Sequence, residues 1–365
     1  MKGEKQERKE MFTLLRIKKH IVFVLVAIVF VFSLLSFSFA ATQKALTVSF
    51  IDVGQGDSII VQTPQGKNIL IDSGPNTAES TVLSYLKSKG ITKLDMVVVS
   101  HPHEDHIGNM DVIIQNFAVG KVYAPNVTTN TKAFESFLLA VKGKGLKFSI
   151  PEVGQDISPD SKVKMIVLSP SKKDKYEDLN DYSIVLKVEY GKTSFLLMGD
   201  ATASIEEKLL HDNKLKQYLK SNVLKIGHHG SKYSSTSTFL STVKPKYAVI
   251  SVGKDNPYGH PFPLTLSKLK SLGAEILRTD EQGTITITSD GQTIKVNKKA
   301  SAIKPQAPPS SSTSKYAYIG NSNTKKFHYP WCTWAKKIAP YHRVYFKTRQ
   351  EAISAGYVPC KVCKP

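Results

Sequence analysis

The sequence predicts an α/β domain followed by a small separate module. Three observations predict this architecture. Short apolar strands alternate with helical patterns from Leu46 to about residue 298, residues 299–315 are rich in Pro and Ser, and all three cysteines lie beyond that stretch. The 365 residues are 41% hydrophobic and 22% charged, which excludes collagen, wholesale disorder and a membrane protein with several spans.

Residues 1–40 have the pattern of an export signal. Seven basic residues precede an apolar run over residues 21–39, and Ser38-Phe39-Ala40 has the small-x-small pattern that a signal peptidase cuts. We expect cleavage after Ala40 and a secreted, extracellular protein. The apolar run is also near the length that spans a bilayer, so the alternative is an uncleaved anchor on the outer face of the cytoplasmic membrane.

The predicted elements of residues 41–298 alternate in order along the chain. The helix over residues 78–89 stops at Gly90, a residue favoured just after helix ends. The expected strands are residues 46–53, 58–63, 68–72, 94–100, 163–168, 183–190, 193–198, 222–226, 247–252, 284–288 and 293–296. The other expected helices are residues 109–116, 131–142, 204–210 and one near Ser237.

Six histidines of this domain lie at a predicted strand end or in a Gly/Pro loop. They are His101, His103, His106, His228, His229 and His260. A rigid strand end fixes imidazole geometry while the loop leaves an open coordination position, which is what a catalytic metal needs. Three imidazoles and two acids within residues 101–106 would repel or stay unsatisfied in a purely structural loop, so we expect this segment to hold two ions.

The segment Ser100-His101-Pro102-His103-Glu104-Asp105-His106 resembles the HxHxDH signature of the metallo-β-lactamase superfamily. Further strings in matching order are similar to the branch found in ComEC-type competence proteins, where this domain is attached to a DNA-uptake channel. They are residues 52–58, 71–74, 180–183, 199–200, 225–231 and 258–261. The resemblance covers residues 46 to about 298 and implies a four-layer αββα sandwich.

The resemblance also implies the ligands of two divalent ions. It assigns His101 and His103 to the first ion, Asp105 and His106 to the second, and Asp200 as a bridging carboxylate. One histidine of the pair His228 and His229 completes the second site; the sequence leaves the choice open and we favour His228. Asp72 is implied as the residue that orients the ligand loop.

One position departs from superfamily members with two full zinc sites. Those members carry a further histidine where this chain has Asn180, and ComEC-type domains share the departure. Oxygen-rich ligation tolerates manganese as well as zinc, so we expect Zn or Mn.

The chemistry that follows is hydrolysis by a metal-bound hydroxide, without a Ser or Cys nucleophile. His260, or the imidazole of His228 and His229 that is not a ligand, is expected to protonate the leaving alkoxide. His260 could instead belong only to a rigid Gly-His-Pro turn, and Asp57, a second catalytic candidate, could belong only to the tight turn Gly54-Gln55-Gly56-Asp57.

The module over residues 316–365 carries a second metal signature. Three residues separate His328 from Cys332 and two separate Cys360 from Cys363, so each pair can chelate one structural zinc ion. A Cys360–Cys363 disulfide is the alternative, but it would leave Cys332 unpaired. The module resembles the zinc-binding domain of Ada-type DNA repair proteins; His328 stands where those proteins carry their first cysteine, which indicates a structural site rather than methyl-acceptor activity.

The net charge of +20 is concentrated at the C-terminus. Residues 1–40 and 41–297 each carry +4, whereas residues 298–365 carry thirteen basic groups and one acidic group. Lysines and arginines with interleaved aromatic residues suit DNA, but the rings could equally form the core of a small module, and a basic surface would also bind anionic cell-wall polymers.

These features favour an exported metal-dependent phosphodiesterase or nuclease that acts on extracellular DNA. One alternative is a hydrolase of another phosphodiester, such as cell-wall phosphocholine or a nucleotide. The other is a non-catalytic, metal-stabilised protein that binds DNA or the cell surface.

Overall fold

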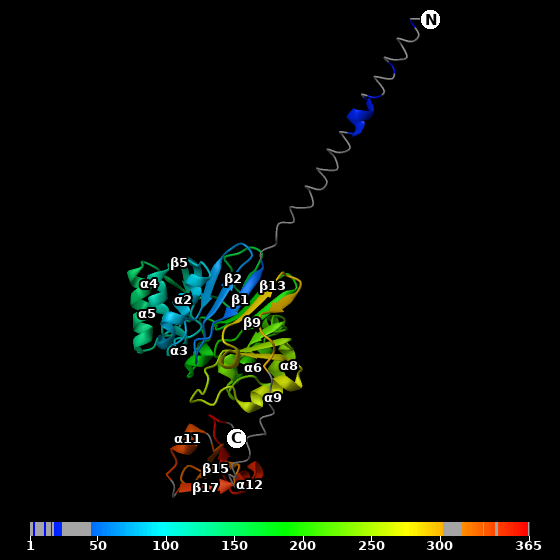
Figure 1. Cartoon of the computed structure of the whole chain (residues 1–365). Helices are drawn as coiled ribbons and strands as arrows, with labels where there is room; N and C mark the ends of the chain where they lie inside the picture. Colours follow the sequence, from blue (N-terminus) through cyan, green and yellow to red (C-terminus); the bar gives the residue numbers. More distant parts are fainter. Residues whose placement is uncertain are drawn as a thin grey trace. The chain divides into compact units, whose positions relative to one another are not determined.

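The structure is a computed structural model that describes residues 45–301, 316–330, 332–339, 342–363 and 365, with residues 3, 11, 16 and 18–23 near the N-terminus. These residues form two compact units divided after Ser301 (Figure 1). Most of the expected leader (residues 1–40) and linker (residues 299–315) lies outside the described residues. No helix in the described part of the chain is long and apolar enough to cross a membrane.

The first sheet of the larger unit has eight strands in the order β14-β13-β1-β2-β3-β4-β5-β6. Neighbours from β3 to β6 are parallel and the others antiparallel, so the sheet is mixed. Its strands are β1 (Leu46–Phe50), β2 (Ile59–Gln62), β3 (Asn68–Ile71), β4 (Lys93–Val98), β5 (Ala118–Tyr123), β6 (Phe148–Ser149), β13 (Ile285–Ser289) and β14 (Ile294–Val296).

The second sheet has six strands in the order β12-β11-β10-β9-β8-β7. It is antiparallel from β7 to β9 and parallel from β9 to β12. Its strands are β7 (Lys164–Ser169), β8 (Val185–Tyr190), β9 (Thr193–Leu197), β10 (Val223–Lys225), β11 (Tyr247–Ile250) and β12 (Glu275–Arg278). The expected hairpin at Gly191-Lys192 joins β8 to β9, with Tyr190 opposite Thr193.

Helices lie in two groups, one beside each sheet (Figure 1). The first group is α2 (Glu79–Ser88), α3 (Glu104–Ile107), α4 (Met110–Asn116) and α5 (Lys132–Gly143). The second is α6 (Ala203–His211), α7 (Asn213–Lys216), α8 (Ser237–Val243), α9 (Pro263–Ser271) and α10 (Thr279–Gln282). Short 3₁₀ turns are η1 (Asn76–Ala78), η2 (Leu179–Tyr182) and η3 (Gly227–Gly230).

Successive side chains of a strand point to opposite faces of the sheet, and the buried ones form two cores. Ile69 and Ile71 of β3 point into a core shared by both sheets, whereas Leu70 between them packs with the helices α2, α4 and α5. Both faces of the first sheet are therefore covered. The four layers confirm the predicted αββα sandwich. The elements that the sequence did not indicate include β5, β6, β12 and the helices α3, α7, α9 and α10.

The smaller unit has its own sheet, in the order β17-β15-β16-β18. Its elements are β15 (Tyr318–Asn321), β16 (Lys326–His328), α11 (Thr333–Lys336), β17 (Arg343–Phe346), α12 (Arg349–Ser354) and β18 (Val358–Pro359). Phe327, Phe346, Ala352 and Tyr357 form one small buried cluster, and the three cysteines with Ala335 form another. Apolar burial here is slight, so a bound metal ion would contribute much of the folding free energy.

Candidate metal centre

Residues that follow four strands meet at one end of the two sheets. Asp72 follows β3 and residues 101–106 follow the neighbouring parallel strand β4. Asp200 follows β9, and His228 and His229 follow the neighbouring parallel strand β10. Because the carboxyl ends of adjacent parallel strands lie at the same sheet edge, both sheets deliver polar side chains to one place.

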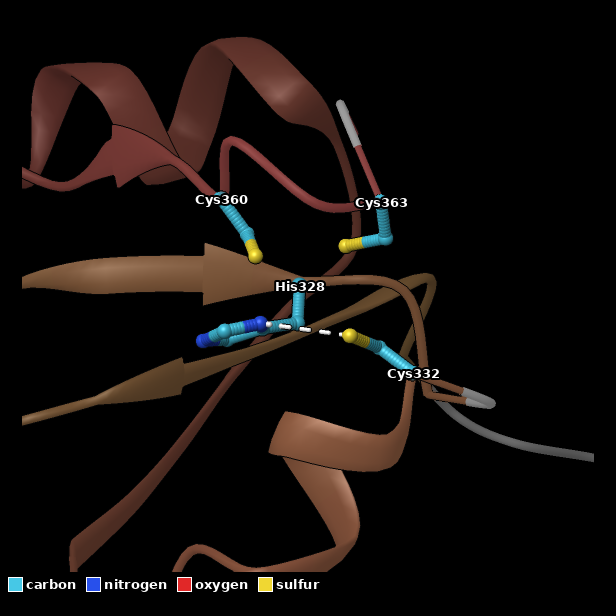
Figure 2. Close-up of side chains that lie close together, drawn as sticks. All are labelled: His328, Cys332, Cys360 and Cys363. Atoms are coloured by element: carbon cyan, nitrogen blue, oxygen red, sulfur yellow. Dashed lines mark hydrogen bonds between the residues drawn. The ribbon is translucent and has the colours of Figure 1, made fainter. Parts of the chain in front are cut away.

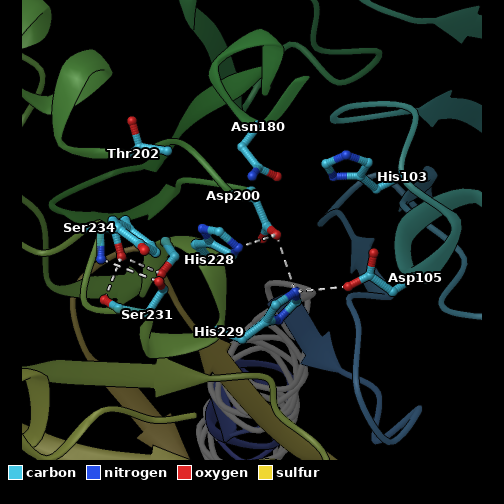
Figure 3. Close-up of polar contacts among 12 residues, drawn as sticks. His103, Asp105, Asn180, Asp200, Thr202, His228, His229, Ser231 and Ser234 are labelled. Atoms are coloured by element: carbon cyan, nitrogen blue, oxygen red, sulfur yellow. Dashed lines mark hydrogen bonds and ion pairs between the residues drawn. The ribbon is translucent and has the colours of Figure 1, made fainter. Parts of the chain in front are cut away.

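Asp105, His106, Asp200 and His229 form a compact cluster, with one ligand atom from each lying within 4.8 Å of the others. Nε2 of His229 lies 3.2 Å from Oδ2 of Asp105 and 3.3 Å from Oδ2 of Asp200 (Figure 3). Nε2 of His106 lies 3.4 Å from the same oxygen of Asp200. All are buried except Asp105, whose side chain is 31% exposed.

Hydrogen bonds behind the two imidazoles set their tautomers. Nδ1 of His106 donates to Oδ2 of Asp72 at 2.8 Å, and Nδ1 of His229 donates to the carbonyl of Ser251 at 2.9 Å. Because Nδ1 of each ring is engaged as a donor, Nε2 is the nitrogen that faces the carboxylates and is available to a metal ion. Asp72 also accepts the backbone N–H of Ser100 at 2.7 Å, so it holds both the strand end and the ring of His106. These two contacts are those expected of a residue that orients the ligand loop, the role that the family resemblance implies for Asp72.

The cluster fits a divalent cation. Among the described residues, Nε2 of His106, Nε2 of His229 and Oδ1 of Asp200 are buried and have no hydrogen-bond partner. Burial would lower the pKa of His229, but the carboxylates of Asp200 and Asp105 raise it to about 10. A centre this negative attracts a positive ion, and mixed imidazole and carboxylate donors suit zinc or manganese.

The compact cluster includes His229 rather than His228, the histidine that the sequence analysis favoured as the ligand. His229 lies in the cluster, whereas Nε2 of His228 is 3.9 Å from Oδ2 of Asp200 and its side chain is 22% exposed. Both residues have left-handed backbone, with φ of 49° and 52°, and their ring centroids lie 6.2 Å apart. This unfavourable conformation separates the two side chains and is typical of functional sites.

His101 and His103 lie beside the cluster but bond to each other. Nε2 of His101 and Nδ1 of His103 are 2.9 Å apart, and neither residue belongs to the compact group. Burial and the neighbouring His106 hold the pKa of His101 well below its usual value, so its ring is neutral. Neutral imidazole is the form that binds a metal.

Asp57 lies behind the cluster rather than in the pocket. Its Oδ2 is 2.7 Å from Nζ of Lys225, and both side chains are almost fully buried. Its Oδ1 is 3.6 Å from Nδ1 of His229. Asp57 therefore positions His229 through charge and packing, and a direct catalytic role has no support from its location. The sequence analysis did not predict the role of Lys225, because the ion-pair partner of a lysine in an apolar strand cannot be identified from the local sequence.

A pocket of about 320 Å³ opens over the cluster. Its lining residues are Gln55, His103, Glu104, Asp105, Asn180, Asp200, His228, His229, Tyr258 and His260. Asn180 contributes a buried Oδ1 that has no hydrogen-bond partner among the described residues. Burial, with His228 and His229 nearby, lowers the pKa of His260 to about 4, so this ring is neutral at pH 7. The sequence motifs contained Gln55, Glu104 and Tyr258, but no role was predicted for them.

The smaller unit brings together the four predicted zinc ligands (Figure 2). His328, Cys332, Cys360 and Cys363 are buried, with ligand atoms within 4.8 Å of one another. All three cysteines are free, so the alternative Cys360–Cys363 disulfide is not formed. Burial and the thiol of Cys332 raise the pKa of Cys363 to about 12. Zinc would reverse this shift, because the thiolate is its ligand.

Comparison with known proteins agrees with both sites. Residues 51–254 match the family model of the metallo-beta-lactamase superfamily. The chain belongs to the metallo-beta-lactamase superfamily. Residues 310–365 of this superfamily member match the model of the metal binding domain of Ada.

A competence protein is among the relatives of this superfamily member. It is 33% identical over 256 residues to ComE operon protein 3 of Bacillus subtilis. This alignment covers 65% of the present chain and 32% of the Bacillus protein. It is 32% identical over 247 residues to competence protein ComA of Neisseria gonorrhoeae, covering 67% and 33%. The chain thus matches about a third of the length of these relatives.

Solved structures include the metallo-beta-lactamase fold protein YhfI of Bacillus subtilis. The two are 10% identical with a TM-score of 0.45, over 69% of this chain and 99% of YhfI.

Proposed function

We propose that the chain is an exported metal-dependent phosphodiesterase that cleaves extracellular DNA. The observation that carries the proposal is the cluster of Asp105, His106, Asp200 and His229 beneath an open pocket. A purely structural metal site is closed by its ligands, whereas a catalytic site keeps access for water and substrate. Asp105, exposed by 31%, lies on the accessible side of this centre.

Different residues of the chain would bind the metal ions, orient the ligand rings and contact the substrate. Asp105, His106, Asp200 and His229 would hold one divalent ion, and His101 and His103 would contribute to a second. Bound there, Zn or Mn would supply an activated water and offset the charge of the phosphoryl group. Asp72 and the carbonyl of Ser251 keep both Nε2 atoms aimed at the centre. The neutral rings of His228 and His260 lie on the pocket wall, where they could hydrogen-bond to phosphate oxygens.

Two observations support DNA as the substrate. One relative, ComA, is named a competence protein, and residues 298–365 carry thirteen basic groups against one acidic group. Phosphate contacts by lysine and arginine supply affinity without sequence preference. We propose that the module with the zinc cluster tethers the enzyme to DNA or to the anionic cell surface.

The test is DNA cleavage by the purified chain with Mn²⁺ or Zn²⁺. We expect cleavage that a chelator stops, and loss of cleavage in Asp105→Ala and Asp200→Ala with an unchanged circular dichroism spectrum. Asp111→Ala, on helix α4 outside the pocket, is the matched control and should keep full activity. A protein that binds metal but leaves single- and double-stranded DNA intact would refute a DNase.

A panel of other phosphodiesters would then separate the remaining possibilities. Turnover of phosphocholine esters or nucleotides, but not of DNA, would indicate the alternative hydrolase. No turnover of any ester would indicate a binding protein. Export is tested separately, by sequencing the N-terminus of the protein recovered outside the cells: a terminus at Ala41 indicates cleavage after Ala40.

A further inference from the structure

Tyr258 lies at the mouth of the pocket with most of its side chain in solvent. It lines the pocket, yet 66% of the residue is exposed. Its ring stacks on that of His260, with centroids 5.7 Å apart and planes 26° from parallel. Covering His260 buries only part of the tyrosine, so packing alone does not account for a large aromatic ring at this position.

The loop that carries Tyr258 is held by one asparagine. Oδ1 of Asn256 accepts the backbone N–H groups of Tyr258 at 3.2 Å and His260 at 3.0 Å. Its Nδ2 donates to the carbonyls of Gly253 at 2.9 Å and His260 at 2.6 Å. The side-chain amide thus uses both ends to fix the turn. An aromatic ring on a fixed loop binds a ligand at a small cost in conformational entropy.

The same loop is joined to the metal-binding segment. The N–H of Phe262 donates to the carbonyl of Gly230 at 2.8 Å, directly after His229. The ring of His260 lies 5.7 Å from that of His228, so Tyr258, His260 and His228 form a row of rings leading from solvent toward the cluster. Nζ of Lys232 lies 5.5 Å from the ring centre of Phe262 and adds a positive charge beside this row.

We propose that Tyr258, supported by His260, is a stacking platform for the nucleobase next to the phosphate at the metal centre. The inference rests on the proposed function and specifies its substrate class as nucleic acid with unpaired bases. Stacking on an aromatic ring tolerates every base, because each base has a π face. The platform would therefore favour nucleotides over phosphodiesters without a base, with little preference among bases.

Binding of two small ligands tests the platform without relying on turnover. Thymidine 5′-monophosphate and 2-deoxyribose 5-phosphate differ in the base, and calorimetry with the manganese-loaded full chain gives both dissociation constants. We expect the nucleotide to bind more tightly by about 5- to 150-fold, the range of one base-stacking contact. Tyr258→Ala should bring this ratio close to one by weakening nucleotide binding only, and Tyr258→Trp should preserve it.

The matched control is Leu264→Ala, which removes another exposed apolar side chain near the loop but outside the pocket. It should leave the ratio unchanged. An unchanged ratio in Tyr258→Ala, an equal loss for both ligands, or no preference in the parent protein would each overturn the platform. Failure of the proposed function looks different: the base preference would be present and lost in Tyr258→Ala, but DNA would stay uncut.

Discussion

Lys225 and Asp57 form a buried ion pair directly behind the metal cluster. Nζ of Lys225 also donates to the carbonyl of Ile226 at 2.8 Å, so the ammonium has a second partner. Removing one member of a buried pair leaves an uncompensated charge, whereas removing both is often close to neutral. The pair therefore matters more for where His229 lies than for net stability.

We expect Lys225→Met to lower the free energy of unfolding by about 3–5 kcal/mol. The double variant Lys225→Met/Asp57→Asn should recover most of this loss, because no buried charge remains. Urea denaturation followed by circular dichroism measures both. A double variant as unstable as the single one would contradict the ion-pair explanation.

A second buried lysine makes stability depend on pH. Lys187 on β8 donates to the carbonyl of Lys220 and to Oγ of Ser221, and burial lowers its pKa from 10.5 to about 8. Between these values the unfolded chain holds a proton that the native protein lacks. The contribution of Lys187 to stability therefore increases from pH 8 to about pH 10, by about 1.4 kcal/mol for each pKa unit.

Comparing Lys187→Met with the parent protein isolates this contribution. Urea titrations give the free energy of unfolding of both proteins at each pH. The difference, parent minus variant, should stay constant from pH 6 to pH 7.5 and rise between pH 8 and pH 10. Lys192→Met, at an exposed turn, should follow the parent at every pH. A constant difference between Lys187→Met and the parent across pH 8–10 would show that Lys187 titrates normally.

At the residue scale, motif spacing predicted the ligand types but not every position. The string over residues 101–106 and Asp200 was sufficient to place three histidines and two ligand carboxylates at strand ends. The choice between His228 and His229 depends on two consecutive left-handed residues, which the sequence Gly-His-His-Gly does not determine. Asp57 was named a catalytic candidate because its pairing with Lys225, which lies far away in the chain, leaves no signal in the sequence.

At the scale of elements, the turn between β1 and β2 supports the ligand loop. Gly56 has φ of +141°, and a Cβ added there would overlap the backbone carbonyl of Asp105. The N–H of Asp57 donates to that same carbonyl at 3.2 Å. The turn is therefore a template against which the segment carrying Asp105 and His106 is held.

Gly56→Ala should weaken metal binding by displacing this segment. Gly66→Ala is the control: Gly66 also has a positive φ, of +79°, but no atom lies within 4 Å of its Cβ position. Backbone strain alone should cost about 1–2 kcal/mol of stability in Gly66→Ala and leave metal affinity intact. Calorimetric titration with Mn²⁺ separates the two, and equal affinities would refute the template role of Gly56.

Most strands of the larger unit were predictable because turn residues flank their apolar runs, but β5, β6 and β12 were not. In β5 the sequence Ala-Val-Gly-Lys-Val-Tyr has Gly120 in its middle, and its pattern is too mixed to indicate a strand. Gly120 is required there by the close backbone of β4: a Cβ would lie 2.6 Å from the carbonyl oxygen of Asp95. Such tertiary causes leave no local signal.

At the scale of the whole molecule, the small unit can be followed separately. Both tryptophans of the chain, Trp331 and Trp334, belong to residues 316–365, so intrinsic tryptophan fluorescence reports on this unit alone. Chelation should unfold it and shift this fluorescence, because three thiols and one imidazole without an ion leave its two small clusters unsupported.

Cys360→Ser should show the shifted fluorescence even with zinc present, whereas His342→Ala, outside the four-residue zinc cluster, should match the parent. The far-UV circular dichroism of the larger unit should persist in both variants. Zinc-independent fluorescence in the parent protein would contradict a structural metal in this unit.

The division into two units was readable from composition, since the linker residues have almost nothing to bury. The layers of the larger unit required the family resemblance, because strand periodicity alone does not say which strands share a sheet. The charge distribution likewise followed from counting residues.

The origin of the four cluster residues has a mechanical consequence. Asp105 and His106 follow a strand of the first sheet, whereas Asp200 and His229 follow strands of the second. An ion held by all four would cross-link the two halves of the sandwich at their open end. Its dissociation would remove this cross-link and leave only the shared core to join the halves, so the melting temperature of the larger unit should rise with the free concentration of the ion.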